Sequence, residues 1–222
     1  MKNLFSGLLV LAGSFFMFGQ EARNVGDFTS LKVYDRIPVE LVKSNKAKVE
    51  VYEGNDGDVE VINKNGELKV RMAVLKKMQG TDARVKIYFK DLRDIQASQG
   101  SIITSQDPID GSILKLTSNE GAKILVEVDV NRLDVKANSG GELKLTGKAK
   151  NQDIIINSGA KYNGEHLKGQ IATVASNAGG VADVYASESV RATVRAGGTI
   201  NVYGDPEDRD AKKVAGGNIN FK

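Results

Sequence analysis

A glycine followed by a small residue returns at nearly constant intervals through the second half of this 222-residue chain. Each of the seven glycines is followed by Gly, Ala or Ser, and neighbouring members stand 18 to 21 residues apart: Gly100, Gly121, Gly140, Gly159, Gly179, Gly197 and Gly216. A tight corner favours residues with little or no Cβ. The spacing predicts a chain folded as a series of short, equivalent units with a period of about nineteen residues.

Two more positions of the repeat are apolar in all seven units. Five residues before the glycine stand Ile95, Leu116, Val135, Ile154, Val174, Ala192 and Ala211. Three residues after it stand Ile103, Ile124, Leu143, Tyr162, Ala182, Ile200 and Ile219. At 41% hydrophobic content, a fully apolar column of seven has a chance of about two in a thousand. The neighbouring positions are mostly polar, so each unit holds two short strands with one side facing inward.

One such unit is too small to bury its own apolar side. Stacking solves this problem, because parallel strands about 4.8 Å apart let each coil cover the next. We therefore predict an all-β fold, a parallel β-helix or β-solenoid of about seven coils over residues 91–222. Asparagine stands two residues before the glycine in four consecutive units, at Asn119, Asn138, Asn157 and Asn177. Stacked amides bond to one another from coil to coil, which predicts a structural ladder; amides lining a polar ligand groove are the alternative.

Residues 20–90 alternate apolar and polar side chains, the pattern of half-buried strands. Asn65-Gly66 is a two-residue hairpin signal, which favours antiparallel pairing there. We expect this region to cap the first coil, so that residues 20–222 form one continuous domain. At the other end, residues 218–222 leave an open strand edge, through which copies of the chain could join.

Residues 1–19 carry a basic start at Lys2 and an apolar stretch over residues 8–18. This is the pattern of a secretory signal peptide, and the apolar stretch is shorter than the roughly 18 to 20 residues of a membrane span. No later stretch is apolar for long enough to span a bilayer. The mature chain is therefore expected to be exported, without a transmembrane segment after cleavage.

The side chains that usually carry chemistry are scarce. The chain has no cysteine and one histidine, which leaves no thiolate nucleophile and no zinc-thiolate site. Its net charge of +3 is spread along the sequence, unlike that of a nucleic-acid binder. No glycine-rich strand is followed by a helical pattern, so the sequence has none of the usual nucleotide-binding motifs. We therefore expect no cofactor, no metal and no nucleic-acid partner, and we interpret the acidic segment Asp205–Asp210 as a solvated turn rather than a calcium site.

Two surface features remain as candidate sites. Tyr185 and Tyr203 both lie six residues after their glycines in consecutive coils, which predicts an exposed aromatic pair suited to a sugar face or a protein partner; packing beneath a loop is the alternative. Asp134 and Asp153 lie one coil apart in an outward column, where two carboxylates could serve a carbohydrate-cleaving β-helix as acid and base. A mixed-charge solvent face is the simpler interpretation of that column.

The segments Phe28–Val33, Val39–Leu41, Ala97–Ser101 and Gly197–Pro206 resemble the GIN domain family of putative auto-transporter adhesins. The resemblance covers nearly all of the chain after residue 19. It implies a secreted, repeat-built β fold of Gram-negative envelopes, located in the periplasm, at the outer membrane or outside the cell, and it supplies no catalytic residue. Together with the residue patterns it predicts a non-enzymatic, adhesin-like binding or scaffolding protein whose partner is an envelope glycan or protein. The alternatives are the enzyme described above and a self-assembling structural protein.

Overall fold

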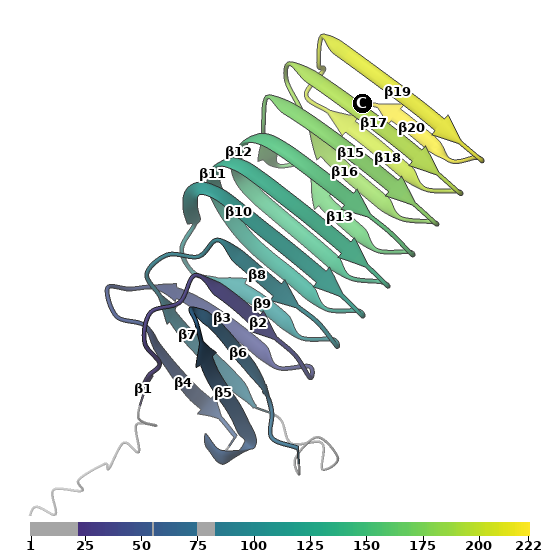
Figure 1. Cartoon of the computed structure of the whole chain (residues 1–222). Coiled ribbons are helices and arrows are strands. Elements are labelled where there is room, and N and C mark those ends of the chain that lie inside the picture. Colours follow the sequence, from purple (N-terminus) through teal and green to yellow (C-terminus); the bar gives the residue numbers. More distant parts are fainter. Residues whose placement is uncertain (1–21, 55, 75–82) are drawn as a thin grey trace, which may run out of the picture.

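Strands stacked coil upon coil make up most of the computed structural model, which describes residues 22–54, 56–74 and 83–222 (Figure 1). The predicted signal peptide, residues 1–19, lies outside the described residues. The strands are β1 (Arg23–Asn24), β2 (Ser30–Val33), β3 (Pro38–Lys43), β4 (Lys48–Glu53), β5 (Val59–Lys64), β6 (Glu67–Met72), β7 (Arg84–Phe89), β8 (Asp94–Ala97), β9 (Ile102–Ser105), β10 (Ile109–Asn119), β11 (Lys123–Asn138), β12 (Glu142–Ile156), β13 (Lys161–Gly164), β14 (Leu167–Lys168), β15 (Ile171–Asn177), β16 (Val181–Tyr185), β17 (Ser189–Arg195), β18 (Thr199–Tyr203), β19 (Asp208–Val214) and β20 (Asn218–Phe221). A short 3-10 helix, η1 (Asp56–Asp58), precedes β5. Within these ranges, no helix has the length and apolarity to cross a bilayer.

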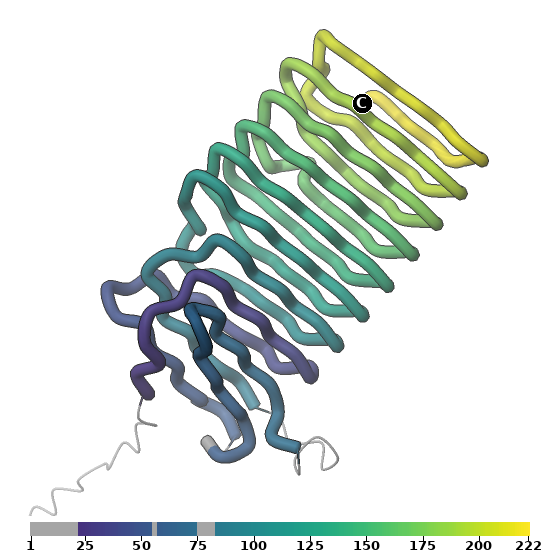
Figure 2. Tube along the Cα trace, in the orientation of Figure 1, coloured from purple at the N-terminus to yellow at the C-terminus, as the bar shows by residue number. Residues whose placement is uncertain are grey.

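Each glycine-cornered coil contributes one strand to each of two faces. On the first face, Lys115 of β10 lies in parallel register between Asp94 of β8 and Asp134 of β11. The second face has its own parallel register, which continues through β9, β11, β12, β13, β16, β18 and β20. The tube in Figure 2 shows these coils in succession from the teal to the yellow part of the chain. The predicted all-β solenoid of about seven coils is therefore confirmed.

The core lies between the two faces and consists of the two predicted apolar columns. Twelve of their fourteen members are at most 3% exposed: Ile95, Leu116, Val135, Ile154, Val174, Ala192, Ile103, Ile124, Leu143, Tyr162, Ala182 and Ile200. The other two belong to the last coil, where Ala211 is exposed and Ile219 is half-buried. Burial in a stack depends on a neighbouring coil on each side. Among the residues that the structure describes, β19 pairs with β17 alone and β20 with β18 alone.

The last coil also changes the chemistry of its inward positions. Arg209 and Lys213 follow Val190 and Val194 in register, so cations stand where the preceding coil has apolar side chains. The Arg209 guanidinium pairs with Asp205 and lies 4.8 Å from the ring centroid of Phe221. Inward-pointing charges are a means of blocking edge-to-edge pairing at the end of a sheet.

The glycine corners contain two consecutive residues in the left-handed region. At one corner, Ser139 has a φ of 51° and Gly140 a φ of 73°, and the other six corners repeat this pair. The third corner residue, Gly141, packs against the preceding coil, where a Cβ would overlap the carbonyl oxygen of Ser118 and lie 2.6 Å from its carbonyl carbon. The small-residue rule therefore has a steric origin. The repeat did not indicate that the residue before each glycine is also left-handed.

The N-terminal region contains the predicted hairpin. Strands β5 and β6 pair antiparallel across Asn65 and Gly66, whose φ angles are 54° and 78°. β4 pairs antiparallel with β7 and with β1. However, β2 pairs in parallel with both β6 and β8, and β3 with both β7 and β9. Parallel stacking thus extends to the N-terminal side of residue 91, the boundary expected from the sequence. The sequence did not reveal this, because apolar and polar side chains alternate with a period of two in parallel and antiparallel strands alike.

Candidate functional site

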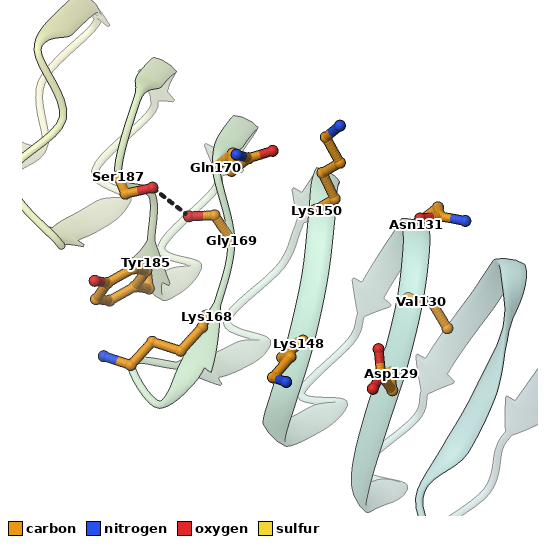
Figure 3. A pocket seen from close by; sticks show the side chains of 10 residues that line it. All are labelled: Asp129, Val130, Asn131, Lys148, Lys150, Lys168, Gly169, Gln170, Tyr185 and Ser187. Carbon is orange, nitrogen blue, oxygen red and sulfur yellow. Dashed lines mark hydrogen bonds between the residues drawn. The ribbon is translucent and has the colours of Figure 1, made fainter.

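A groove of about 400 Å³ opens where the chain turns from the second face to the first face of the next coil, at the corner away from the glycines. We call this turn the second corner. The groove is shown in Figure 3, and its lining residues are Asp129, Val130, Asn131, Lys148, Lys150, Lys168, Gly169, Gln170, Tyr185 and Ser187. They come from four consecutive coils. The groove therefore runs along the stack, across the strands.

Local sequence shapes the second corner differently from coil to coil. β11 and β12 continue around it as single strands, whereas the next coil breaks between β14 and β15 at Gly169. A Cβ at Gly169 would overlap the side-chain amide of Gln152 and lie 2.6 Å from the carbonyl oxygen of Ala149. The break is tied to the following coil, because the Ser187 hydroxyl donates to the Gly169 carbonyl at 3.2 Å (Figure 3). These features make room for the groove.

A buried polar chain supports the wall of the groove. Tyr162 lies inside the stack, and its hydroxyl donates to Oε1 of Gln152 at 3.2 Å. Nε2 of Gln152 in turn donates to the backbone carbonyl of Tyr185 at 2.9 Å. Burial raises the pKa of the Tyr162 phenol far above its ordinary value, so the ring stays neutral and available as a donor. The backbone of Tyr185 is thereby fixed to the core.

The groove is positively charged. Lys148 of β12 lies in register between Asp129 of β11 and Lys168 of β14, so three charged side chains stand on successive coils. Lys150 lies farther along β12, and the lining carries three lysines against one aspartate. In the part of the chain that the structure describes, none of these lysines has an ion-pair partner. Unpaired cations beside one another create a positive potential that attracts anions.

One aromatic ring completes the groove. The ammonium nitrogen of Lys168 lies 3.9 Å from the ring centroid of Tyr185, a cation–π contact (Figure 3). Tyr185 is half-buried and pairs in register with Tyr203 in the next coil. Tyr203 is not part of the groove lining; burial, and then the nearby carboxylates Asp183 and Glu165, raise the pKa of its phenol. The structure thus places only Tyr185 of the predicted aromatic pair among the lysines.

The asparagines lie at the glycine corners, away from the groove. Asn138 donates to Asn119 at 2.7 Å, Asn157 to Asn138 at 2.9 Å, and Asn177 to Asn157 at 2.8 Å. Their amides bond along the stack. A second series on the second face, which sequence reasoning missed, runs from Asn220 through Asn201 to Asp183 with distances of 2.9 and 2.7 Å. It was missed because its members change between Asn and Asp.

The predicted acidic candidates lie outside the groove. Asp134 and Asp153 are adjacent in register on the first face and share the guanidinium of Arg132, at 2.8 and 3.7 Å. In the acidic segment, Asp205 pairs with Arg209 and Asp210 with Arg191. Within the described ranges, no group of three or more His, Asp or Glu side chains gathers as a metal site would.

Sequence reasoning also missed the lysines of the groove. Asp129 and Lys148 each stand eight residues after their glycines, and Lys168 stands nine after its own. A column of charged residues eight positions after the glycine could have indicated this site. One extra residue before Lys168 shifts that lysine out of the column, and loops interrupt the column in the later coils.

Comparison with known proteins gives a family and a fold. The family model described as "Putative auto-transporter adhesin, head GIN domain" matches residues 27–206. Among solved structures, a putative adhesin from Bacteroides fragilis is similar at 20% identity and a TM-score of 0.83, and one from Parabacteroides merdae at 18% and 0.71. A putative lipid binding protein from Parabacteroides distasonis is similar at 17% and 0.69. Each comparison covers 91% of this chain and 95% of the other. Among curated proteins, none matches.

Proposed function

Because the chain belongs to the family of putative auto-transporter adhesins with a head GIN domain, we propose that it is an exported, non-enzymatic binding protein of the bacterial cell envelope. Its binding site is the groove at the second corner, and its partner is an envelope glycan or protein. The observation that carries this proposal is the combination of unpaired lysines with the half-buried ring of Tyr185 in one concave site. Aromatic rings next to polar groups suit both sugar faces and protein surfaces.

The composition of the groove supports binding rather than catalysis. Hydrolysis of a glycosidic bond by the usual route needs two carboxyl groups that flank the bond. The groove lining contains one carboxylate, Asp129. The pair considered from the sequence, Asp134 and Asp153, is held by Arg132 on an open sheet face. Lys148 and Lys168 lie on strands, which position the side chains of a binding site more precisely than loops do.

A binding screen tests the proposal. The purified mature protein is presented to immobilised glycans and to envelope proteins, beside the variants Tyr185→Ala and Tyr203→Ala. We expect Tyr185→Ala to weaken retention of the partner by about tenfold, in line with the loss of one aromatic contact. Tyr52→Ala is the matched control. It removes an exposed ring in β4, which does not line the groove, and it should leave retention of the partner unchanged. Equal loss in the control would refute the location of the site.

An activity assay addresses the enzymatic alternative. The protein is incubated with a panel of polysaccharides, and new reducing ends are measured over time. We expect none above background. Cleavage that disappears in Asp134→Ala or Asp153→Ala would show that the protein is a carbohydrate-active enzyme and would refute the proposed non-enzymatic function.

A further inference from the structure

The charge of the groove indicates the class of ligand. Several outward cations are paired with carboxylates on neighbouring strands, as in Lys32–Glu67, Lys123–Glu142 and Arg191–Asp210. In contrast, Lys148, Lys150 and Lys168 share one groove without an ion-pair partner among the described residues. Three lysines that share one concave site with a single carboxylate, Asp129, create a local positive potential that attracts anions.

The spacing of the coils indicates the form of the ligand. Lys148 and Lys168 stand in register on adjacent coils, and parallel strands are about 4.8 Å apart. The backbone positions of these two lysines are therefore separated along the stack by a distance close to the length of one sugar ring. An extended polymer with one anionic group on each sugar would place successive anions opposite successive coils.

The neutral groups of the groove match the remaining chemistry of such a polymer. Asn131, Gln170 and Ser187 supply amide and hydroxyl groups for sugar hydroxyls, and Tyr185 supplies a ring at one end. Asp129 marks the opposite end, next to Lys148 in register. An acidic ligand is repelled by Asp129 and attracted by the lysines, so it should lie over Lys148, Lys168 and Tyr185.

We propose that the groove binds an anionic polysaccharide, with Lys148 and Lys168 contacting the acidic groups of consecutive sugars and Tyr185 packing against the face of a ring. This inference rests on the proposed binding function and names its ligand class. The lining consists mainly of charged and amide side chains, with Val130 as its one aliphatic residue. The anionic groups of the polymer are therefore the recognised feature.

The test uses the whole mature protein and polygalacturonate, a polymer with one carboxylate per sugar. Its methyl ester is the control ligand, because it keeps the backbone and removes the charge. We expect binding to polygalacturonate at least about tenfold tighter than to the ester. Raising the ionic strength from about 0.01 M to about 1 M shortens the Debye length from about 30 Å to about 3 Å and should abolish the difference.

Charge reversal locates the site. The double variant Lys148→Glu/Lys168→Glu should lose at least about tenfold in affinity for polygalacturonate. Lys136→Glu/Lys144→Glu changes the net charge equally at two exposed lysines of β11 and β12 that do not line the groove, and it should bind as the unchanged protein does. Circular dichroism of both double variants reports whether the fold is kept. Equal losses in the two would overturn the assignment to the groove.

Three other outcomes separate the two proposals. Equal binding of the ester and the acid overturns the anionic ligand but leaves a binding function in place. Tighter binding to phosphatidylglycerol vesicles than to polygalacturonate, measured against phosphatidylcholine vesicles, overturns the polysaccharide in favour of a membrane surface. Retention of no polymer, vesicle or envelope protein overturns both proposals.

Discussion

Replacement of Gly141 by Ala tests the steric origin of the small-residue corner. Gly141 is the third residue of its corner, and its backbone joins two neighbouring coils. Its N–H donates to the Asn138 carbonyl at 2.9 Å, and its own carbonyl accepts from Lys161 at 2.9 Å. An added methyl group would overlap the Ser118 carbonyl oxygen and lie 2.9 Å from the Ser118 hydroxyl oxygen. The Ser118 hydroxyl is itself engaged, because it donates to the Ala122 carbonyl at 2.7 Å.

The expected cost follows from these contacts. The coil cannot accept the methyl group without moving backbone, and overpacking of a tight site costs about 3 kcal/mol of unfolding free energy at the upper end of its usual range. Gly140→Ala is the matched control. Gly140 has a φ of 73°, but no atom lies within 4 Å of the added Cβ, so only the left-handed conformation costs energy, about 1 kcal/mol.

Thermal unfolding followed by far-UV circular dichroism measures the difference. For a chain of this size, about 1 kcal/mol lowers Tm by about 2–4 °C, so Gly141→Ala should lower it by about 6–12 °C and Gly140→Ala by about 2–4 °C. Urea titration gives the same ranking as a shift in the midpoint. Equal shifts, or a larger one for Gly140→Ala, would show that backbone conformation rather than contact between coils selects small residues at this corner.

Three further perturbations test the stack, its interior and its end. Val135→Asp puts an unpaired charge at a position that is 3% exposed and should cost roughly 4 kcal/mol or more by urea denaturation, whereas Lys136→Asp, exposed on the same strand, should be nearly neutral; similar costs would contradict the inward and outward assignment. Because burial raises the pKa of Tyr162, its neutral form stabilises the fold at neutral pH, and this contribution is lost as the pH rises above about 10, where the unfolded chain ionises first. Tyr162→Phe should flatten that alkaline decline in a pH series of urea midpoints, and an unchanged slope would refute the linkage. Arg209→Val combined with Lys213→Val should make the last coil apolar and produce concentration-dependent association in size-exclusion chromatography; association of the unchanged protein over the same range would instead favour the self-assembling alternative.

The period, the apolar columns and the glycine corners could be predicted from residue patterns. Equivalent positions of successive coils have the same surroundings, so the same type of residue recurs at each of them. Positions 135 and 154 both need an apolar side chain, since they are in register on adjacent coils and both face the interior. The hairpin at Asn65-Gly66 could also be predicted, because these residue types tolerate the positive φ that both adopt. The pairing of the N-terminal strands could not be predicted, since their alternation of apolar and polar side chains fits a cap and a coil equally well. Only hydrogen bonding showed that β2 and β3 lie between β6–β7 and β8–β9.

The candidate site was less accessible than the fold. Tyr185 stood out as an aromatic residue in an outward column, but its proximity to Lys168 depends on how two loops cross the second corner. The chain gives those loops different lengths, so equal sequence offsets no longer mean neighbouring positions. Lys148 and Lys168 are twenty residues apart in sequence and adjacent in register.

The sequence by itself determined the all-β class, the period, the inward columns and the small corners, because stacking imposes the same local requirement at every turn. The tertiary structure alone decided where the stack begins, which cations remain unpaired, and that a groove opens beside Tyr185. These properties depend on which side chains of different coils come together. Local periodicity does not contain that information, because register across an irregular corner is set by the packing of the whole stack.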